Sequence, residues 1–191
     1  MIAFDDVSLS FGRRALFSNV TLNLHSGKII GVTGANGSGK STFLKLAGKI
    51  LRPDGGEVRL PDDKTIAALS PEMKIYDTLT ARENLSFFAR LRGKTLNLLE
   101  LGERVGLDLE TFGNVRAENL STGMRQRLKF AILLSVDADI WLLDEPTANL
   151  DDDGRDKFFN EIRNATDKII LLATNDKAEV TLCDEIIKLP L

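Results

Sequence analysis

A glycine-rich stretch, GANGSGKST, runs from Gly34 to Thr42 and fits the spacing G-x-x-x-x-G-K-[ST] without a mismatch. Glycines let backbone N–H groups turn toward phosphate oxygens, and a helix that begins there adds the field of its N-terminus. We expect Lys40 to reach the β- and γ-phosphates and the Ser41 hydroxyl to ligate Mg²⁺. The alternative is a glycine-rich turn that binds nothing. The residues expected to contact a nucleoside triphosphate are Gly34, Asn36, Gly37, Ser38, Gly39, Lys40, Ser41 and Thr42.

Two acidic residues follow an apolar run in the segment DIWLLDEP. A buried strand over residues 140–143 would deliver Asp144 and Glu145 to the carboxyl edge of a sheet, where open α/β sheets bind ligands. Asp144 then suits Mg²⁺, through water, and Glu145 is placed to polarise an attacking water as general base. The alternative is a strand that runs out into a solvated acidic turn, and the phosphate loop elsewhere in the chain argues against it.

The segments around these motifs predict the elements that position them. Residues 2–33 show period-two alternation with turns at GRR and HSGK, which predicts antiparallel strands, and KIIGVTG is typical of a buried central strand. KSTFLKLAGKI has helical spacing until RPDGGEV breaks it. Apolar residues at helical spacing between 76 and 118 indicate an α-helical insert. After residue 120, helices and strands alternate, which implies a parallel sheet with helices on its faces.

Composition limits the class of protein. The 191 residues fit one domain, and the net charge of −3 gives no electrostatic reason to expect nucleic acid as the main partner. Cys183, the single cysteine, excludes an internal disulfide and is expected to be buried packing, since His25 is the only histidine that could activate it. The sequence shows no signal peptide and no apolar segment of about 18 residues, so we expect a cytosolic chain with any membrane span in a partner.

The motifs GANGSGKST, LSTGMRQRL, LLDEP and NLD, in that order, resemble the ATPase subunit of an ATP-binding-cassette (ABC) transporter over essentially the whole chain. The resemblance implies an α/β P-loop NTPase with a RecA-like parallel-sheet core, an antiparallel β subdomain and an α-helical subdomain. It implies a single domain over 1–191, with the core and β subdomain in 1–70 and 119–191 and the helical subdomain in about 71–118. The compact length resembles small bacterial exporter cassettes, including the haem-exporter type of cytochrome c maturation.

The resemblance also implies a dimer in which the phosphate loop of one subunit and the signature loop of the other sandwich each ATP. In LSTGM, which resembles the family's L-S-G-G-Q, Ser121, Thr122 and Gly123 would meet the partner's γ-phosphate. Read alone, LSTG is a helix cap with Ser121 or Thr122 as N-cap.

For three further segments the resemblance implies a functional role, and each also has an ordinary structural role as the alternative. Phe11 falls where the family places an aromatic ring against adenine, and the alternative is a core phenylalanine. Residues 149–151 resemble the loop that crosses the dimer interface, although the acids at 151–153 could simply favour a helix N-terminus through its dipole. Phe87, Phe88 and Leu91 would belong to the surface that docks a transmembrane subunit, or to the core of the helical subdomain.

Two positions depart from the family pattern. Where the family has a Mg²⁺-sensing glutamine after the strand IAALS, this chain has Pro71 or Glu72, and Glu72 is either a metal ligand or an exposed loop acid. Where the family usually has a histidine after LLAT, this chain has Asn175. An asparagine can donate a hydrogen bond to phosphate but cannot take up a proton, and His25 cannot be assumed to replace the histidine.

The expected function is that of a Mg²⁺-dependent ATPase with Glu145, Asn175 and Lys40 as catalytic residues and with weak turnover. It would power transport through a separate transmembrane permease, on the cytoplasmic face of the membrane, as a homo- or heterodimer. The alternative is a nucleotide-gated regulatory cassette with little or no hydrolysis. Asn175, Met124 and the missing glutamine favour that alternative, while Glu145 argues against it.

Overall fold

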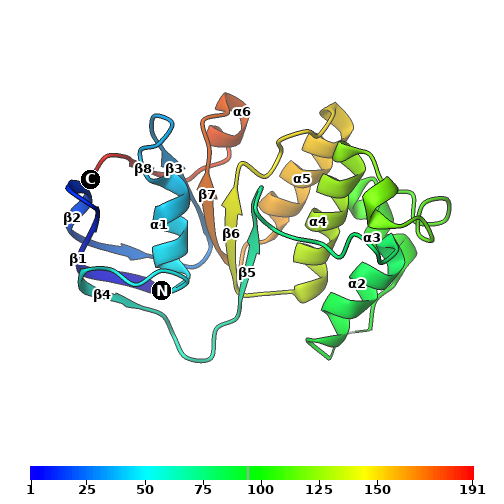
Figure 1. The fold of residues 1–191 in the computed structure, drawn as a ribbon, viewed down its shortest axis with the longest axis horizontal. Helices are drawn as coiled ribbons and strands as arrows, with labels where there is room; N and C mark the ends of the chain where they lie inside the picture. The colour runs from blue at the N-terminus through cyan, green and yellow to red at the C-terminus, as the bar shows by residue number, and fades with distance from the viewer. Residues whose placement is uncertain (94) are drawn as a thin grey trace. The chain divides into compact units, whose positions relative to one another are not determined.

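The computed structural model describes residues 1–93 and 95–191 and divides the chain into two compact units (Figure 1). The first comprises Met1–Ile66, Asp139–Glu145 and Thr166–Leu191, and the second comprises Ala67–Ala138 and Pro146–Ala165. The predicted helical insert lies in the second unit, and its division from the core at residues 71 and 118 stays a prediction.

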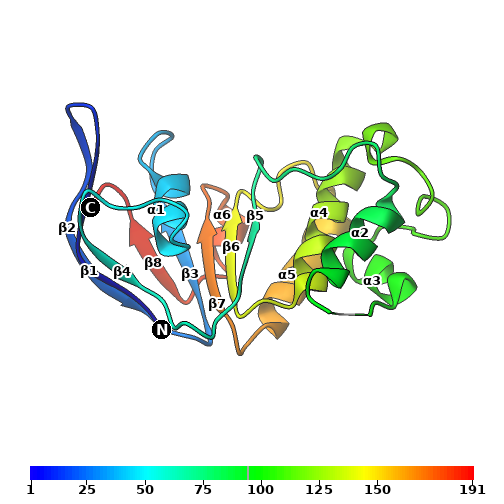
Figure 2. The ribbon, with the colours of Figure 1, turned by 60° about the horizontal axis from the view of Figure 1, so that its bottom comes forward.

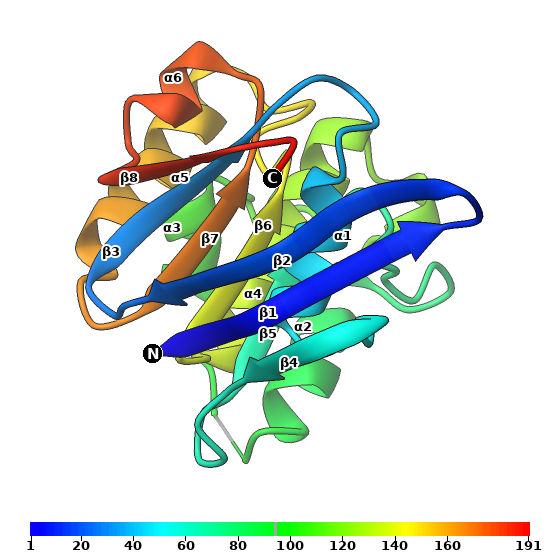
Figure 3. The same ribbon diagram turned by 90° about the vertical axis from the view of Figure 1, so that its left-hand side faces the viewer.

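The first unit contains an antiparallel sheet of β1 (Ile2–Phe11), β2 (Arg14–Leu24) and β4 (Gly55–Arg59), in the order β2-β1-β4 (Figure 3). The alternating apolar residues of β1 point to one buried face. The predicted antiparallel start of the chain is confirmed. The strand β4 is not predicted from the sequence, because RPDGGEV indicates only the end of a helix.

A parallel sheet forms the other layer of the first unit, with β6 (Ile140–Asp144), β7 (Ile169–Ala173), β3 (Lys28–Thr33) and β8 (Glu185–Lys188) in that order. Nearly every residue of β6 and β7 is buried, as is expected for strands covered on both faces. In the register, Ala173 pairs with both Val32 and Asp144, so β3, β6 and β7 end at the same edge. The strand β5 (Ile66–Leu69) starts at the last residue of the first unit.

The helix α1 (Lys40–Ala47) lies between the two sheets of this unit (Figure 2). The ring of Phe43 stacks on Phe4 of β1, with centroids 4.9 Å apart, and meets Phe17 of β2 edge-on. This core fixes the start of α1 relative to the strands. The short helix α6 (Lys177–Val180) also belongs to this unit. The predicted α/β fold, a parallel-sheet core with an antiparallel β subdomain and helices, is confirmed.

The second unit is helical, with α2 (Ala81–Arg90), α3 (Leu98–Val105), the 3₁₀ turn η1 (Ala117–Asn119), α4 (Thr122–Val136) and α5 (Asp152–Asn164). Figure 1 shows α2 and α3 beside α4. Phe130 of α4 packs on Phe158 of α5, with ring centroids 4.8 Å apart. Within the described ranges, no helix is long and apolar enough to cross a bilayer.

Candidate functional site

The predicted phosphate loop is the turn between β3 and α1. Gly39 precedes the helix with φ +102°, and no side chain caps the first turn, so its N–H groups keep their capacity to bind a ligand. Gly34 has φ +152°, and a Cβ there would lie 2.7 Å from Ser38 Oγ and 2.9 Å from the carbonyl oxygen of Leu189. Both positions therefore require glycine, and the loop keeps its backbone open.

Lys40 is only 7% exposed and its ammonium group lies over the loop itself. Its Nζ donates hydrogen bonds to the carbonyl oxygens of Gly34, at 3.0 Å, and Ala35, at 3.4 Å. The hydroxyl oxygen of Ser38 is buried and has no hydrogen-bond partner among the described residues. A buried hydroxyl without a partner is costly, and phosphate oxygens would supply the missing acceptor.

The second predicted motif lies at the carboxyl end of β6. Asp144 is half-buried and Glu145 is exposed. The backbone of Glu145 has φ +47°, a conformation that costs an L-residue roughly 1–2 kcal/mol. Its N–H donates to the carbonyl oxygen of Ala173 at 3.0 Å, which holds the turn on the sheet edge. Strain of this kind persists where the surrounding structure enforces it, and it is common at functional sites.

A cavity of about 400 Å³ brings both motifs together within the first unit. Its volume lies in the range usual for small-ligand sites. Two lining residues, Arg14 and Leu16, were missed by the sequence reasoning, and Arg14 Nη2 lies 3.5 Å from the carbonyl oxygen of Gly37. The only sequence signal for Arg14 is the basic turn that follows Phe11. The predicted residues that line the cavity are Phe11, Asn36, Gly37, Gly39, Lys40, Ser41, Thr42, Asp144 and Glu145.

Phe11 is 58% exposed and lines this cavity at the end of β1. The alternative that it is a core phenylalanine is therefore wrong. An exposed ring at the edge of a cavity can stack on a flat aromatic group without any hydrogen bond.

Asn175 follows β7 and faces the phosphate loop. Its side-chain amide donates to Asn36 Oδ1 at 3.1 Å. His25 lies in the turn before β3, at the opposite end of that strand from the loop. Six residues of strand span roughly 20 Å, so His25 does not substitute for a histidine beside the loop.

Ser41 and Asp144 are the residues of this cavity that fit a magnesium ion. Both offer hard oxygen donors, which Mg²⁺ prefers, and both line the same space. In the part of the chain that the structure describes, no three His, Cys, Asp or Glu side chains converge as a metal cluster. The ion would therefore complete its shell with phosphate oxygens and water. Glu72 is exposed in the loop after β5, in the second unit, and its role as a metal ligand stays a prediction.

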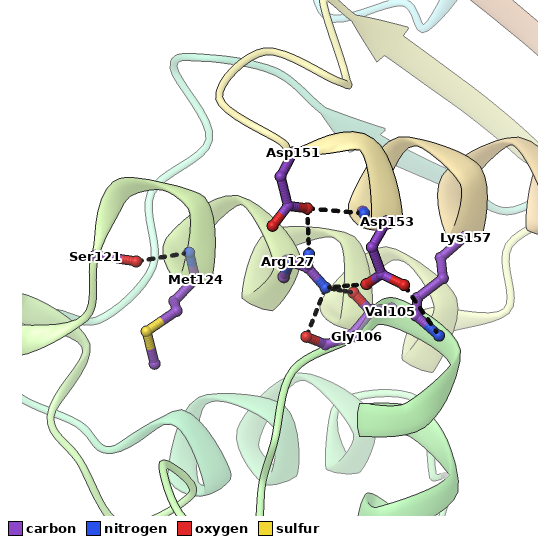
Figure 4. Close-up of polar contacts among 9 residues, drawn as sticks. Val105, Gly106, Ser121, Met124, Arg127, Asp151, Asp153 and Lys157 are labelled. Carbon is purple, nitrogen blue, oxygen red and sulfur yellow. Dashed lines mark hydrogen bonds and ion pairs between the residues drawn. The ribbon is translucent and has the colours of Figure 1, made fainter.

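The predicted signature loop begins α4 in the second unit. Of the two candidate caps, Ser121 is the N-cap, and its Oγ accepts a hydrogen bond from the Met124 N–H at 3.2 Å (Figure 4). Thr122 is exposed in the first turn. The carbonyl oxygen of Asn149 lies 3.1 Å from where a Cβ on Gly123 would be, so the loop before α5 packs on the start of α4. The cap leaves the Ser121 hydroxyl proton free to donate to a ligand.

The structure also gives the local role of two residues outside the cavity, Asp151 and Cys183. Asp151 is the N-cap of α5, where its carboxylate accepts from the Gly154 N–H at 2.9 Å. Cys183 is half-buried, and burial raises the pKa of its thiol to about 11. A thiol with this pKa is a poor nucleophile at neutral pH, so Cys183 is a packing residue, as predicted.

Comparison with known proteins agrees with this geometry. The sequence profile of the ABC transporter family matches residues 17–148. The chain is 39% identical, over 86% of its own length and 86% of the relative's, to the cytochrome c biogenesis ATP-binding export protein CcmA of Bradyrhizobium diazoefficiens. It is 34% identical to part of the mouse ABC-type organic anion transporter ABCA8B, and that match covers 85% of this chain and 11% of the relative.

Solved structures show the same fold. The dimeric structure of the bacterial ABC transporter cassette MJ0796 superposes with a TM-score of 0.85 at 27% identity and covers 99% of this chain and 94% of that one. A dimeric post-hydrolysis structure of the same cassette holds ADP and Pi and superposes equally well.

Proposed function

This chain belongs to the ABC transporter family, and we propose that it binds and hydrolyses ATP to power transport through a separate membrane subunit. One observation carries the proposal: a single cavity holds the phosphate loop, Lys40, Ser41 and both acids at the end of β6. Phosphoryl transfer to water needs positioning and charge neutralisation, and these residues supply both.

Binding of ATP follows from the residues of this cavity. The ring of Phe11 stacks on adenine, which needs no hydrogen bond. The N–H groups at the start of α1 and the ammonium group of Lys40 bind the phosphates, and Lys40 exchanges its contacts with the loop carbonyls for phosphate oxygens. Gly34 and Gly39 hold the loop in its conformation, because a Cβ at either position would lie within 2.7 or 2.9 Å of other protein atoms.

Hydrolysis uses the carboxyl edge of the sheet. Bound Mg²⁺ supplies positive charge that neutralises the phosphates, and Ser41 and Asp144 are the residues that would hold it. The carboxylate of Glu145 accepts a proton from the attacking water. Asn175 donates its amide N–H to the γ-phosphate in place of Asn36, but it carries no charge. Weak turnover is the expected consequence.

A dimer completes the site in this proposal. The Ser121 hydroxyl and the N–H groups at the start of α4 would bind the γ-phosphate held by a second subunit, because both are donors at the positive end of a 15-residue helix. The dimeric structures of the cassette MJ0796 support this arrangement. In this proposal the second subunit is another copy of this chain.

A surface on α2 supports the proposal of a membrane partner. Tyr76, Phe87 and Leu91 are 49%, 37% and 66% exposed, and the Tyr76 and Phe87 rings meet edge-on, 5.0 Å apart. A cavity of about 590 Å³ that Phe87 and Leu91 line is also lined by Arg82, Glu83 and Arg90. We infer that a membrane subunit docks here on the cytoplasmic side, with an exporter as the transporter type that the CcmA relative favours.

The second candidate is the regulatory cassette, which Asn175 favours because an amide cannot take up a proton. Glu145 in the cavity favours hydrolysis. The test is the rate of ATP turnover with Mg²⁺ across a range of protein concentrations, for the wild type and Asn175→His. We expect a rate that rises faster than linearly with protein and that Asn175→His increases. Tight ATP binding without turnover in either form, even with the membrane subunit restored, would leave the regulatory cassette.

A further inference from the structure

We propose that Arg127 is a positioning residue that locks the signature helix α4 to the loop of residues 149–151, so that both meet the second subunit as one rigid surface. The inference rests on the proposed function, in which both segments face a partner subunit. It concerns only residues of the second unit.

The guanidinium group of Arg127 is enclosed by the second unit and its side chain is only 10% exposed. It donates to the carbonyl oxygens of Val105, at 3.2 Å, and Gly106, at 2.6 Å, and to Asp153 Oδ2 at 3.1 Å. It also donates to the carboxylate of Asp151 (Figure 4). One side chain of α4 therefore joins the end of α3 to the first turn of α5.

Two glycines make room for this group. Gly106 has φ +69°, and a Cβ there would overlap Arg127 Nη1. A Cβ on Gly154 would lie 3.1 Å from Arg127 Nη2. Nη1 contacts three acceptors with two N–H groups, so two of these acceptors share a hydrogen, while Nη2 donates to Asp151. The planar guanidinium spreads these donors over two nitrogens in fixed directions, whereas a lysine ammonium has three donors on one atom.

The loop of residues 149–151 is held on α4 at two points. The carbonyl oxygen of Asn149 packs on Gly123, in the first turn of the helix, and Asp151 pairs with Arg127 one turn later. The Gly154 N–H, together with Arg127, keeps the pKa of the Asp151 carboxyl below its ordinary value. Because residues four apart on a helix share a face, the two attachments fix both the place and the direction of the loop.

The hydrogen bonds from the buried guanidinium to Val105 and Gly106 stabilise the fold, but the two ion pairs add little. The carboxylates of Asp151 and Asp153 are 71% and 64% exposed, and ion pairs to exposed carboxylates contribute little to folding. What the contacts do provide is a fixed geometry between the signature loop and residues 149–151. Such a link matters for docking of a second subunit, since both segments must meet it together.

Arg104 offers a matched control. It also joins α3 to α5, through two hydrogen bonds to Glu161 at 2.8 and 2.7 Å, but it makes no contact with residues 149–151 that the structure describes. A variant of Arg104 therefore removes a comparable link between helices and leaves the loop attachment in place.

The experiment uses the Glu145→Gln chain, in which bound ATP is not consumed, and measures ATP-dependent self-association by sedimentation velocity. We expect Arg127→Met and Arg127→Lys to raise the dimer dissociation constant at least tenfold. The dissociation constant of a fluorescent ATP analogue, measured on monomer, should change less than twofold. Arg104→Met should alter neither constant more than twofold.

Each result decides the inference. Self-association unchanged in both Arg127 variants would overturn it and leave the proposed function standing. Failure of the Glu145→Gln chain to associate with ATP would overturn the proposed dimer and this inference with it. If circular dichroism shows that Arg127→Met does not fold, Arg127→Lys and Asp151→Asn give the answer, because Asp151→Asn weakens the contact with Arg127 while asparagine still caps α5. A tenfold loss that also appears in Arg104→Met would mean general loosening of the helices and would contradict a specific role of Arg127.

Discussion

The left-handed backbone at Glu145 leads to a test that separates stability from catalysis. With φ +47°, any residue other than glycine is strained at this position. The strain is roughly 1–2 kcal/mol for an L-residue. Glycine removes it, but glycine loses more conformational freedom on folding, which costs about 0.5–1 kcal/mol. At the midpoints of these two ranges, the balance favours Glu145→Gly over Glu145→Ala by about 0.75 kcal/mol.

A comparison of Glu145→Gly with Glu145→Ala isolates the free energy of the backbone conformation, because both changes remove the same exposed side chain. Removing an exposed side chain changes stability by less than about 0.5 kcal/mol, so we expect Glu145→Ala to unfold close to the wild type. For a chain of this size, about 1 kcal/mol shifts the melting temperature by about 2–4 °C.

The assay is thermal unfolding by circular dichroism without nucleotide, beside ATP turnover of the same samples. Glu145→Gly should melt about 1–4 °C above Glu145→Ala, and both should lose turnover. If Glu145→Gly melts below Glu145→Ala, the claim that the backbone at position 145 is strained is refuted. ATP turnover at the wild-type rate in either chain would refute the catalytic role of the carboxylate.

Two further predictions concern the first unit. Gly39→Ala should weaken binding of a fluorescent ATP analogue at least tenfold, because its φ of +102° is strained for any L side chain; equal affinity would contradict the requirement for glycine. The pKa of Asp139 is held well below its ordinary value by the N–H of Thr65 and by Lys64, so its contribution to stability is present above the unfolded pKa and is lost as pH falls through the lower folded value. Asp139→Asn should therefore melt a few degrees below the wild type at pH 7, and the two melting temperatures should converge in acid. A constant difference in melting temperature from pH 7 down to pH 2 would contradict this account.

The parts of the fold that the sequence predicted are those with local signals. The strand, glycine loop and helix around Lys40 are contiguous, so spacing alone identifies them. The apolar run before Asp144 likewise predicted β6. The strand β4 was missed because its signal is weak, since it begins with two glycines and gains its order by pairing with β1, about fifty residues earlier.

In the site, too, features with a local sequence signal were predicted and features that depend on tertiary packing were not. The sequence predicted which residues would gather at the carboxyl edge of the sheet, because parallel strands end together. It did not predict Arg14 in the cavity or the hydrogen bond from Asn175 to Asn36, 139 residues apart. It also gave no sign that Arg127 would bind the loop before α5, since that contact depends on how three helices pack. Contacts of this kind arise from tertiary packing, which residue spacing does not encode.

The most direct test of the central claim is a single-turnover measurement of γ-phosphate cleavage from bound ATP, with Mg²⁺, in the wild type and in Glu145→Gln. The two side chains have nearly the same size, so ATP binding should be equal while only the carboxylate can accept a proton from water. We predict that the wild type releases phosphate and that Glu145→Gln retains intact ATP, with a rate at least a hundredfold lower, as expected for loss of a general base. Equal cleavage rates in the two chains would contradict the account, as would a wild type that binds ATP and never cleaves it.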